Sequence, residues 1–110
     1  MNIIDYETAG GKSLIDEYLE KLPLSEQLEA VDIRLKIEEK GMLALETLNT
    51  RRLRGKMWEI KFSQNRIMYI VKDGDTIYFL HACKKQKGKA EKHELETAMG
   101  RAKKFGLKVD

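Results

Sequence analysis

The spacing of hydrophobic residues divides the chain into a helical part and a sheet-forming part. Between residues 13 and 41, apolar side chains recur at intervals of three and four positions, which is the period of an amphipathic helix. From residue 52 to residue 83 they alternate with polar side chains or form short apolar runs, as they do in strands. The pattern therefore predicts helices followed by a sheet, which is the α+β fold class.

Two helices are predicted after a short first strand at residues 2–7. Ser13 can cap the first helix and Pro23 ends it, whereas Ser25 can cap the second and Gly41 ends it. The two helices would form an antiparallel hairpin with an acidic outer face. Four apolar residues at helical spacing predict the buried stripe of the second helix: Leu24, Leu28, Val31 and Leu35.

The alternation of apolar and polar residues after residue 52 predicts three or four strands. Within residues 57–62, Trp58 shares a face with two further apolar residues, and Lys61 lies on the other face. We expect Trp58 to be a core residue for this reason. Asp73-Gly74 is a hairpin signal that leads into the most apolar strand, residues 76–83.

Together these elements predict a single domain over residues 1–110. An N-terminal strand and a two-helix hairpin would pack on one face of a mostly antiparallel sheet of four or five strands. A C-terminal helix is predicted over residues 90–104. The other face of the sheet is expected to be open to solvent or to a ligand.

The composition favours a cytoplasmic protein. No apolar run approaches the ~20 residues of a membrane span, so no membrane association is expected. The N-terminus lacks the basic start and the apolar stretch of a signal peptide. Cys83 is the only cysteine, which excludes an intrachain disulfide and fits a reducing compartment.

Charge is divided unevenly between the two halves of the chain. Residues 1–50 contain eleven acidic and five basic residues, a net charge of −6, whereas residues 51–110 contain seven acidic and sixteen basic residues, a net charge of +9. A basic half of this kind indicates an anionic partner, nucleic acid above all. A solvated lysine-rich surface would give the same composition.

Three neighbouring predicted elements bring five basic residues toward one surface: Lys61, Arg66, Lys84, Lys85 and Lys87. Arginine offers phosphate a two-pronged hydrogen-bonded contact and lysine a point charge. Clustered lysines also lower one another's pKa, so that one of them can exchange protons near neutral pH. These residues could therefore form a ribonuclease site without a metal. A basic group would deprotonate a ribose 2′-hydroxyl, arginine would stabilise the charge on the phosphate, and another cation would protonate the 5′-oxygen.

Other candidate chemistry has less support in the sequence. His81, Cys83 and His93 match no zinc-binding spacing, so neither a metal site nor a cofactor is expected. Two lysines next to Cys83 would lower the pKa of its thiol as in a nucleophile, but a small apolar strand residue fits this position better. His81 lies inside an apolar strand and is expected to be a hydrogen-bonded structural histidine.

Four short motifs follow one another between residues 53 and 87: Leu53-Arg54-Gly55, Met57-Trp58-Glu59-Ile60-Lys61, Asn65-Arg66-Ile67-Met68-Tyr69 and Phe79-Leu80-His81-Ala82-Cys83-Lys84-Lys85. In this order and spacing they resemble the RelE/HigB superfamily of toxins, in particular its phage-derived HigB-like branch. The resemblance implies a RelE-like fold. It also implies the toxin of a bacterial type II toxin–antitoxin system, an endoribonuclease that cleaves mRNA on the ribosome.

The resemblance also implies site residues and a partner. Lys61, Arg66, Lys84 and Lys87 would be catalytic, and Arg54, Lys56, Lys85 and Lys89 would bind RNA. The partner would be a cognate antitoxin, a helix-turn-helix protein encoded next to the toxin. One departure is that no tyrosine follows Tyr78, whereas RelE-like toxins often have one near the start of the last helix.

Two other functions remain open. The chain could be a catalytically degenerate toxin-like module that binds RNA, the ribosome or a partner protein without cleavage, which the missing tyrosine favours. It could also regulate its own operon through DNA, although no recognition helix is evident in the sequence.

Overall fold

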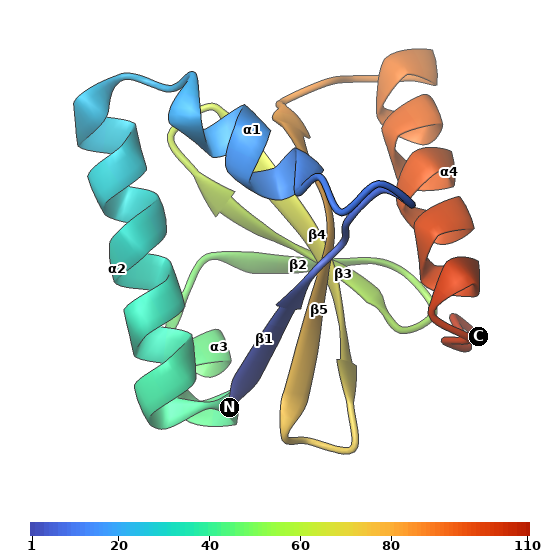
Figure 1. Cartoon of the computed structure of the whole chain (residues 1–110), viewed down its shortest axis with the longest axis horizontal. Coiled ribbons are helices and arrows are strands. Elements are labelled where there is room, and N and C mark those ends of the chain that lie inside the picture. Colours follow the sequence, from blue (N-terminus) through green and yellow to red (C-terminus); the bar gives the residue numbers. More distant parts are fainter.

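A computed structural model describes all 110 residues of the chain. The elements follow in the order β1 (Asn2–Asp5), α1 (Leu14–Glu20), α2 (Leu24–Lys40), α3 (Met42–Thr47), β2 (Thr50–Arg54), β3 (Met57–Phe62), β4 (Asn65–Lys72), β5 (Thr76–Lys84) and α4 (Lys89–Lys104). Figure 1 shows the sheet between α1, α2 and α3 on one side and α4 on the other. The α+β class is confirmed.

The sheet has five strands in the order β1-β5-β4-β3-β2. β1 pairs with β5 in parallel, and the other three pairs are antiparallel, which confirms the expected mostly antiparallel sheet. Asp73 and Gly74 both have positive φ angles in the turn between β4 and β5, as the hairpin signal predicts. None of the helices is both long enough and apolar enough to cross a membrane.

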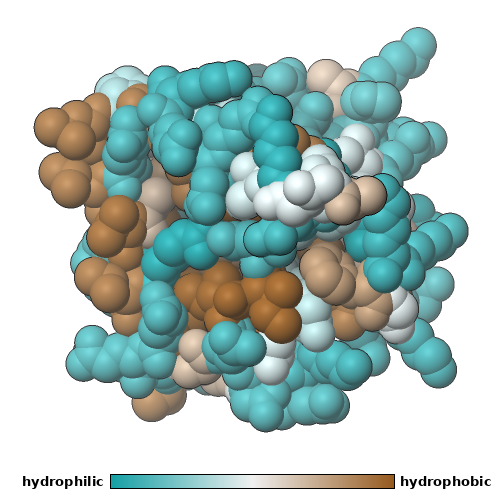
Figure 2. All heavy atoms as spheres, in the orientation of Figure 1, coloured by the Kyte–Doolittle hydropathy of each residue, from teal (hydrophilic) through white to brown (hydrophobic).

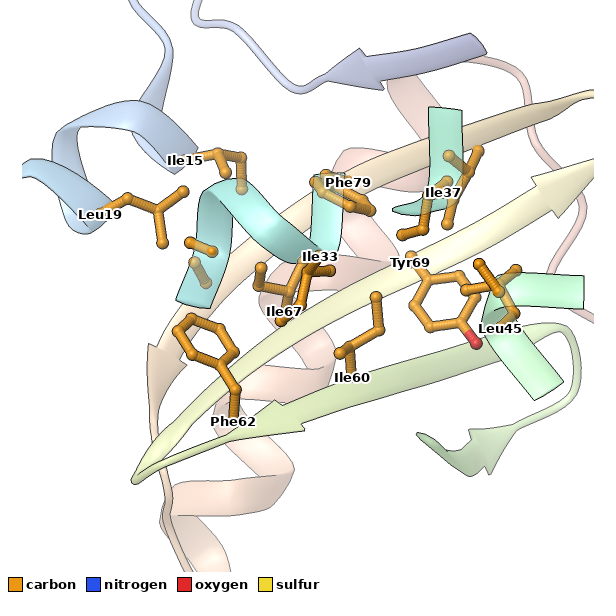
Figure 3. Close-up of a cluster of buried hydrophobic side chains, with 14 of the residues drawn as sticks. Ile15, Leu19, Ile33, Ile37, Leu45, Ile60, Phe62, Ile67, Tyr69 and Phe79 are labelled. Carbon is orange, nitrogen blue, oxygen red and sulfur yellow. The ribbon is translucent and has the colours of Figure 1, made fainter. Parts of the chain in front are cut away.

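The first face of the sheet carries the larger core. Ile15 of α1, Ile33 of α2 and Leu45 of α3 point toward apolar side chains of β3, β4 and β5, among them Ile60 and Phe79 (Figure 3). The Ser13 hydroxyl accepts a hydrogen bond from the backbone N–H of Asp16 at 3.1 Å and caps α1 as expected. Gly41 ends α2, also as expected.

The second face is not open along its whole length, so that expectation is wrong. α4 and the C-terminal tail pack on it and bury a second core that includes Met57, Met68, Leu80, Ala98 and Ala102. The strands present apolar side chains on this side as well, and alanines on α4 allow its backbone to come close to them. Only one end of this face stays uncovered, and the candidate site lies there.

The buried face of α2 was also predicted wrongly. The stripe Leu24, Leu28, Val31 and Leu35 faces solvent, with 52 to 70% of each residue exposed. The helix instead buries Ala30, Ile33 and Ile37 against the sheet. It begins at Leu24, one residue before the predicted cap, and Pro23 occupies the cap position. Because α2 has two apolar faces with similar spacing, its sequence alone does not decide which one is buried.

Two further features near β2 and β3 differ from expectation. The six-residue helix α3 was not predicted. Trp58 was expected in the core but is 37% exposed, and it lines an open hollow with Met42 of α3 and Tyr69 of β4. Trp58 does share its sheet face with Ile60, but α3 is too short to cover this end of the face.

An irregularity in β5 decides which of its side chains reach the second face. Met68 of β4 pairs with His81, whereas the next residue, Tyr69, pairs with Phe79, so Leu80 is an extra residue on β5. Such a bulge reverses the alternation of side chains along the strand. Phe79 therefore lies in the first core, while His81 and Cys83 lie on the side of α4.

Candidate functional site

The uncovered end of the second face forms a cleft of about 280 Å³ between the sheet and the start of α4. Its walls come from β2, β3, β4, β5, the loop after β5 and the first turns of α4. Six basic and three acidic residues line it together with three others: Arg51, Glu59, Lys61, Arg66, Met68, Cys83, Lys84, Lys85, Gln86, Lys87, Glu91 and Glu94.

Strand register sets the floor of the cleft. Lys61 of β3 lies directly opposite Arg66 of β4, and Arg66 lies opposite Cys83 of β5. The next row on the same face contains Glu59, Met68 and His81. Residues opposite one another in a sheet have their Cβ atoms about 5 Å apart, so Lys61 and Arg66 present two adjacent cations from rigid strands.

A buried carboxylate orients Arg66. Glu59 is 1% exposed, and its Oε2 lies 3.6 Å from Nε of Arg66. The Arg66 side chain also donates from Nη1 to the backbone carbonyl of Asn65 at 2.9 Å. These contacts leave Nη2 of the guanidinium group for a ligand, and they fix its plane in advance.

Arg51 joins the floor of the cleft to α4. Its Nε lies 2.9 Å from Oε2 of Glu59, and its Nη2 donates to Glu91 in the first turn of α4. Glu59 is therefore shared between Arg51 and Arg66, which keeps a buried charge paired on two sides. Lys61, Lys85 and Lys87 form no ion pair in the structure and keep their charge available to an anion.

Glu94 is held at the wall of the cleft by a hydrogen-bonded chain. The guanidinium of Arg101 lies 3.0 Å from Nδ1 of His81, and Nε2 of His81 contacts the Glu94 carboxylate. Because arginine only donates, Nδ1 of His81 must accept, and its proton is on Nε2 and points to Glu94. This confirms a hydrogen-bonded His81, and it gives Glu94 a fixed orientation that the sequence did not reveal.

Burial and hydrogen bonding set the protonation states in this chain. Burial lowers the pKa of His81, which keeps the imidazole neutral at neutral pH. Burial alone would raise the pKa of Glu94, but hydrogen bonds from His81 and Cys83 outweigh it and hold that pKa below its usual value. Burial raises the pKa of the Cys83 thiol to about 12, so Cys83 is a thiol rather than a nucleophilic thiolate.

His81, Cys83 and Glu94 are close enough to be considered as metal ligands. One ligand atom from each lies within 4.8 Å of the others, although their spacing in the sequence matches no metal motif. The hydrogen bonds already made by Glu94, the raised pKa of Cys83 and the adjacent cation of Arg101 all disfavour a bound cation. The arrangement fits a proton-accepting carboxylate better than a metal centre.

The structure brings together five of the residues singled out from the sequence, since Lys61, Arg66, Lys84, Lys85 and Lys87 all line the cleft. The ammonium group of Lys84, however, donates to the buried side chain of Asn65 at 3.0 Å. Three others lie outside the cleft: Arg54, Lys56 and Lys89. The functional roles assigned to these eight residues stay predictions.

Sequence reasoning missed the acidic side of the cleft. The alternation within β3 predicts Glu59 on the same face as Lys61, but it gave no reason to include Glu59 in the site. Glu91 and Glu94 are three residues apart at the start of the last helix and so point to one side. Arg51 had no signal of its own, because only the pairing of β2 with β3 places it beside Glu59.

One comparison with known proteins identifies a related group. A family model described as "Phage derived protein Gp49-like (DUF891)" matches residues 17–103, which is most of the chain and includes every residue of the cleft. No curated protein is significantly similar to the chain.

Proposed function

The chain belongs to the phage-derived Gp49-like family, a group of HigB/RelE-like toxins, and from this premise we propose that it is a ribosome-dependent endoribonuclease. It would be the toxin of a bacterial type II toxin–antitoxin system and would cleave mRNA. One observation carries the proposal. Lys61 and Arg66 lie side by side on the floor of a cationic cleft, and the Glu94 carboxylate is fixed at its wall.

Each group in the cleft has a role in this reaction. Arg66 would hold the scissile phosphate through its remaining N–H groups, with Lys61 neutralising the charge that develops on it. The Glu94 carboxylate would take the proton of the ribose 2′-hydroxyl, because His81 and Cys83 keep it ionised. The 2′-oxygen then bonds to phosphorus, and the bond from phosphorus to the 5′-oxygen breaks as Lys87 protonates that oxygen.

The products of this reaction would be a 2′,3′-cyclic phosphate and a 5′-hydroxyl. Glu94 would thus replace the tyrosine that RelE-like toxins often carry in this region. Lys84 would contribute its positive charge at the edge of the cleft and would not donate a proton, because its ammonium group is hydrogen-bonded to Asn65. The message and the ribosome would supply the remaining orientation of the substrate.

Inducible expression in a bacterial host tests the activity. The unaltered protein should arrest growth, and primer extension should reveal new 5′ ends within mRNA codons that a polynucleotide kinase can label directly. Arg66→Ala should lower cleavage by about 100-fold or more, because one preorganised donor to a developing oxyanion contributes this much. Glu94→Gln should lower it by roughly 100-fold, the typical contribution of a positioned general base.

A matched control comes from the same strand. Lys72 lies at the far end of β4 from Arg66 and is exposed, so Lys72→Ala removes an equal charge outside the cleft and should leave cleavage unchanged. Growth arrest without new mRNA ends would refute the nuclease proposal. A folded Arg66→Ala variant that cleaves as well as the unaltered protein would refute the assigned site.

The second candidate function is binding without cleavage. No tyrosine lines the cleft, and the Glu94 carboxylate is already engaged by two neighbours, both of which favour a degenerate site. The same experiment separates the candidates, since a binder would slow translation while leaving mRNA intact. For either function we propose a cognate antitoxin as the partner protein, encoded next to this chain.

A further inference from the structure

The outer face of α2 carries a row of apolar side chains that lie outside both hydrophobic cores. Leu24, Leu28, Val31 and Leu35, called the α2 stripe below, are each more than half exposed. Figure 2 shows hydrophobic side chains along the edge of the molecule where α2 lies in Figure 1. Single exposed leucines are common, but an unbroken row on one helix is typical of an interaction surface.

The spacing within the α2 stripe indicates the shape of its partner. The four residues are separated by four, three and four positions, which is the repeat of a helix that packs lengthwise against another helix. The stripe lies opposite the buried face formed by Ala30, Ile33 and Ile37, so a second helix could lie along it without disturbing the core. A helix-on-helix contact therefore fits this surface better than a strand or a loop.

Charges beside the α2 stripe indicate the composition of the partner. A hollow of about 180 Å³ next to Val31 is lined by Asp16 and Glu20. Arg34 also lines this hollow, but its guanidinium group is bound to Asp5 at 2.9 Å and is largely buried. Three exposed acidic residues of α2 complete the rim, namely Asp32, Glu38 and Glu39. Lys36 pairs with Asp32 at 2.8 Å, and the rim as a whole keeps a net negative charge.

Such a rim attracts a helix with basic flanks. It disfavours a second copy of this chain, because two copies would bring acidic rims together. An anionic membrane surface is disfavoured for the same reason.

We propose that the α2 stripe docks an amphipathic helix of a second protein, with apolar residues at intervals of three and four and with Lys or Arg beside them. The identity of that protein as the antitoxin rests on the proposed function, whereas the docking surface does not. The stripe and the cleft lie on opposite sides of the sheet, so the docked helix leaves Arg66 and Lys61 uncovered. The partner would then inhibit the protein by its size or by holding it in a complex, and not by filling the cleft.

Binding measurements on the full chain test this surface. One probe is the purified product of the open reading frame next to its gene. The other is a pair of synthetic helical peptides with the same leucine spacing and either lysine or glutamate flanks. Leu28→Lys/Leu35→Lys should weaken binding of the frame product by about 100-fold or more, since two central contacts are lost. Leu43→Lys replaces an equally exposed leucine on α3, outside the stripe, and should change affinity less than about threefold.

Several results would overturn the proposal. The double variant could bind the product of the adjacent open reading frame as tightly as the unaltered protein does, or the unaltered protein could fail to bind it. The peptide with glutamate flanks could also bind as tightly as the peptide with lysine flanks. A dimer of the chain alone that the double variant dissociates would assign the surface to a second copy.

Failure of the nuclease proposal would look different. In that case neither the unaltered chain nor the double variant would arrest growth, while binding would still depend on Leu28 and Leu35.

Discussion

The side chain of Asn65 joins three elements at the end of the sheet, and its removal should be costly. It is fully buried, with 0% of the residue exposed. Its Oδ1 accepts from the hydroxyl of Tyr18 at 2.6 Å and from Nζ of Lys84 at 3.0 Å, while its Nδ2 donates to Oε1 of Glu26 at 2.6 Å. One amide therefore connects α1, α2 and β5 to the start of β4.

The cost of Asn65→Ala can be worked from these contacts. The neutral bond from the Tyr18 hydroxyl contributes about 1 kcal/mol, and the charge-assisted bond to the largely buried Glu26 about 1.5 kcal/mol. Lys84 is 51% exposed and regains water, so its bond contributes only about 0.5 kcal/mol. The variant should lose about 3 kcal/mol of unfolding free energy and roughly 10 °C of melting temperature.

Urea denaturation of four proteins measures this prediction. Tyr18→Phe alone should lose about 1 kcal/mol, because it removes one bond and no volume. In the Asn65→Ala background the same change should cost almost nothing, so the double-mutant cycle should give a coupling of about 1 kcal/mol. A loss below about 1 kcal/mol for Asn65→Ala, or additive single changes, would refute the assigned network.

Three further changes test other parts of the structure. A methyl group on Gly55 would overlap the carbonyl oxygen of Val109, so Gly55→Ala should cost roughly 2–4 kcal/mol in urea denaturation. Gly74→Ala has the same kind of backbone angle in open space and should cost only about 1–2 kcal/mol; equal losses would contradict the close approach. Burial lowers the folded-state pKa of His81 below its ordinary value of 6.5, so the unfolded chain binds more protons as the pH falls through that range. Stability should therefore decrease from neutral pH toward pH 5, and less so in His81→Gln; parallel pH profiles of the two proteins would refute this cause. Because burial raises the pKa of Cys83 to about 12, alkylation of the native thiol at pH 8 should be at least about 100-fold slower than in the unfolded chain. Comparable rates for native and unfolded protein would show an accessible thiolate.

The candidate site could be predicted in its basic half but not in its acidic half. Lys61 and Arg66 carry a charge signal, because cations at strand ends next to a tight turn converge in any antiparallel hairpin. Glu59 and Glu94 carry no such signal, since acidic residues on strands and helices are usually solvated. Only the packing of α4 onto the second face turns Glu59 into a buried partner of Arg66 and brings Glu94 to the cleft.

The sequence alone determined the order of the longer helices and the main strands, though not the short helix α3, because caps, turns and hydrophobic periods act over a few residues. The Ser13 cap and the Asp73-Gly74 turn are examples that the structure confirms. Tertiary packing decided the matters that depend on distant residues. Leu28 and Ile33 are equally apolar members of one helix, and only the sheet beneath α2 selects which of them is buried.

The position of the extra residue in β5 also depends on residues that are distant in the sequence. Pairing with β4 sets its position, and a shift of one residue sends a side chain to the opposite face of a sheet. That shift places the side chain of His81 next to Glu94. The hydrogen bond that holds the Glu94 carboxylate at the cleft therefore depends on the fold rather than on any local pattern in the sequence.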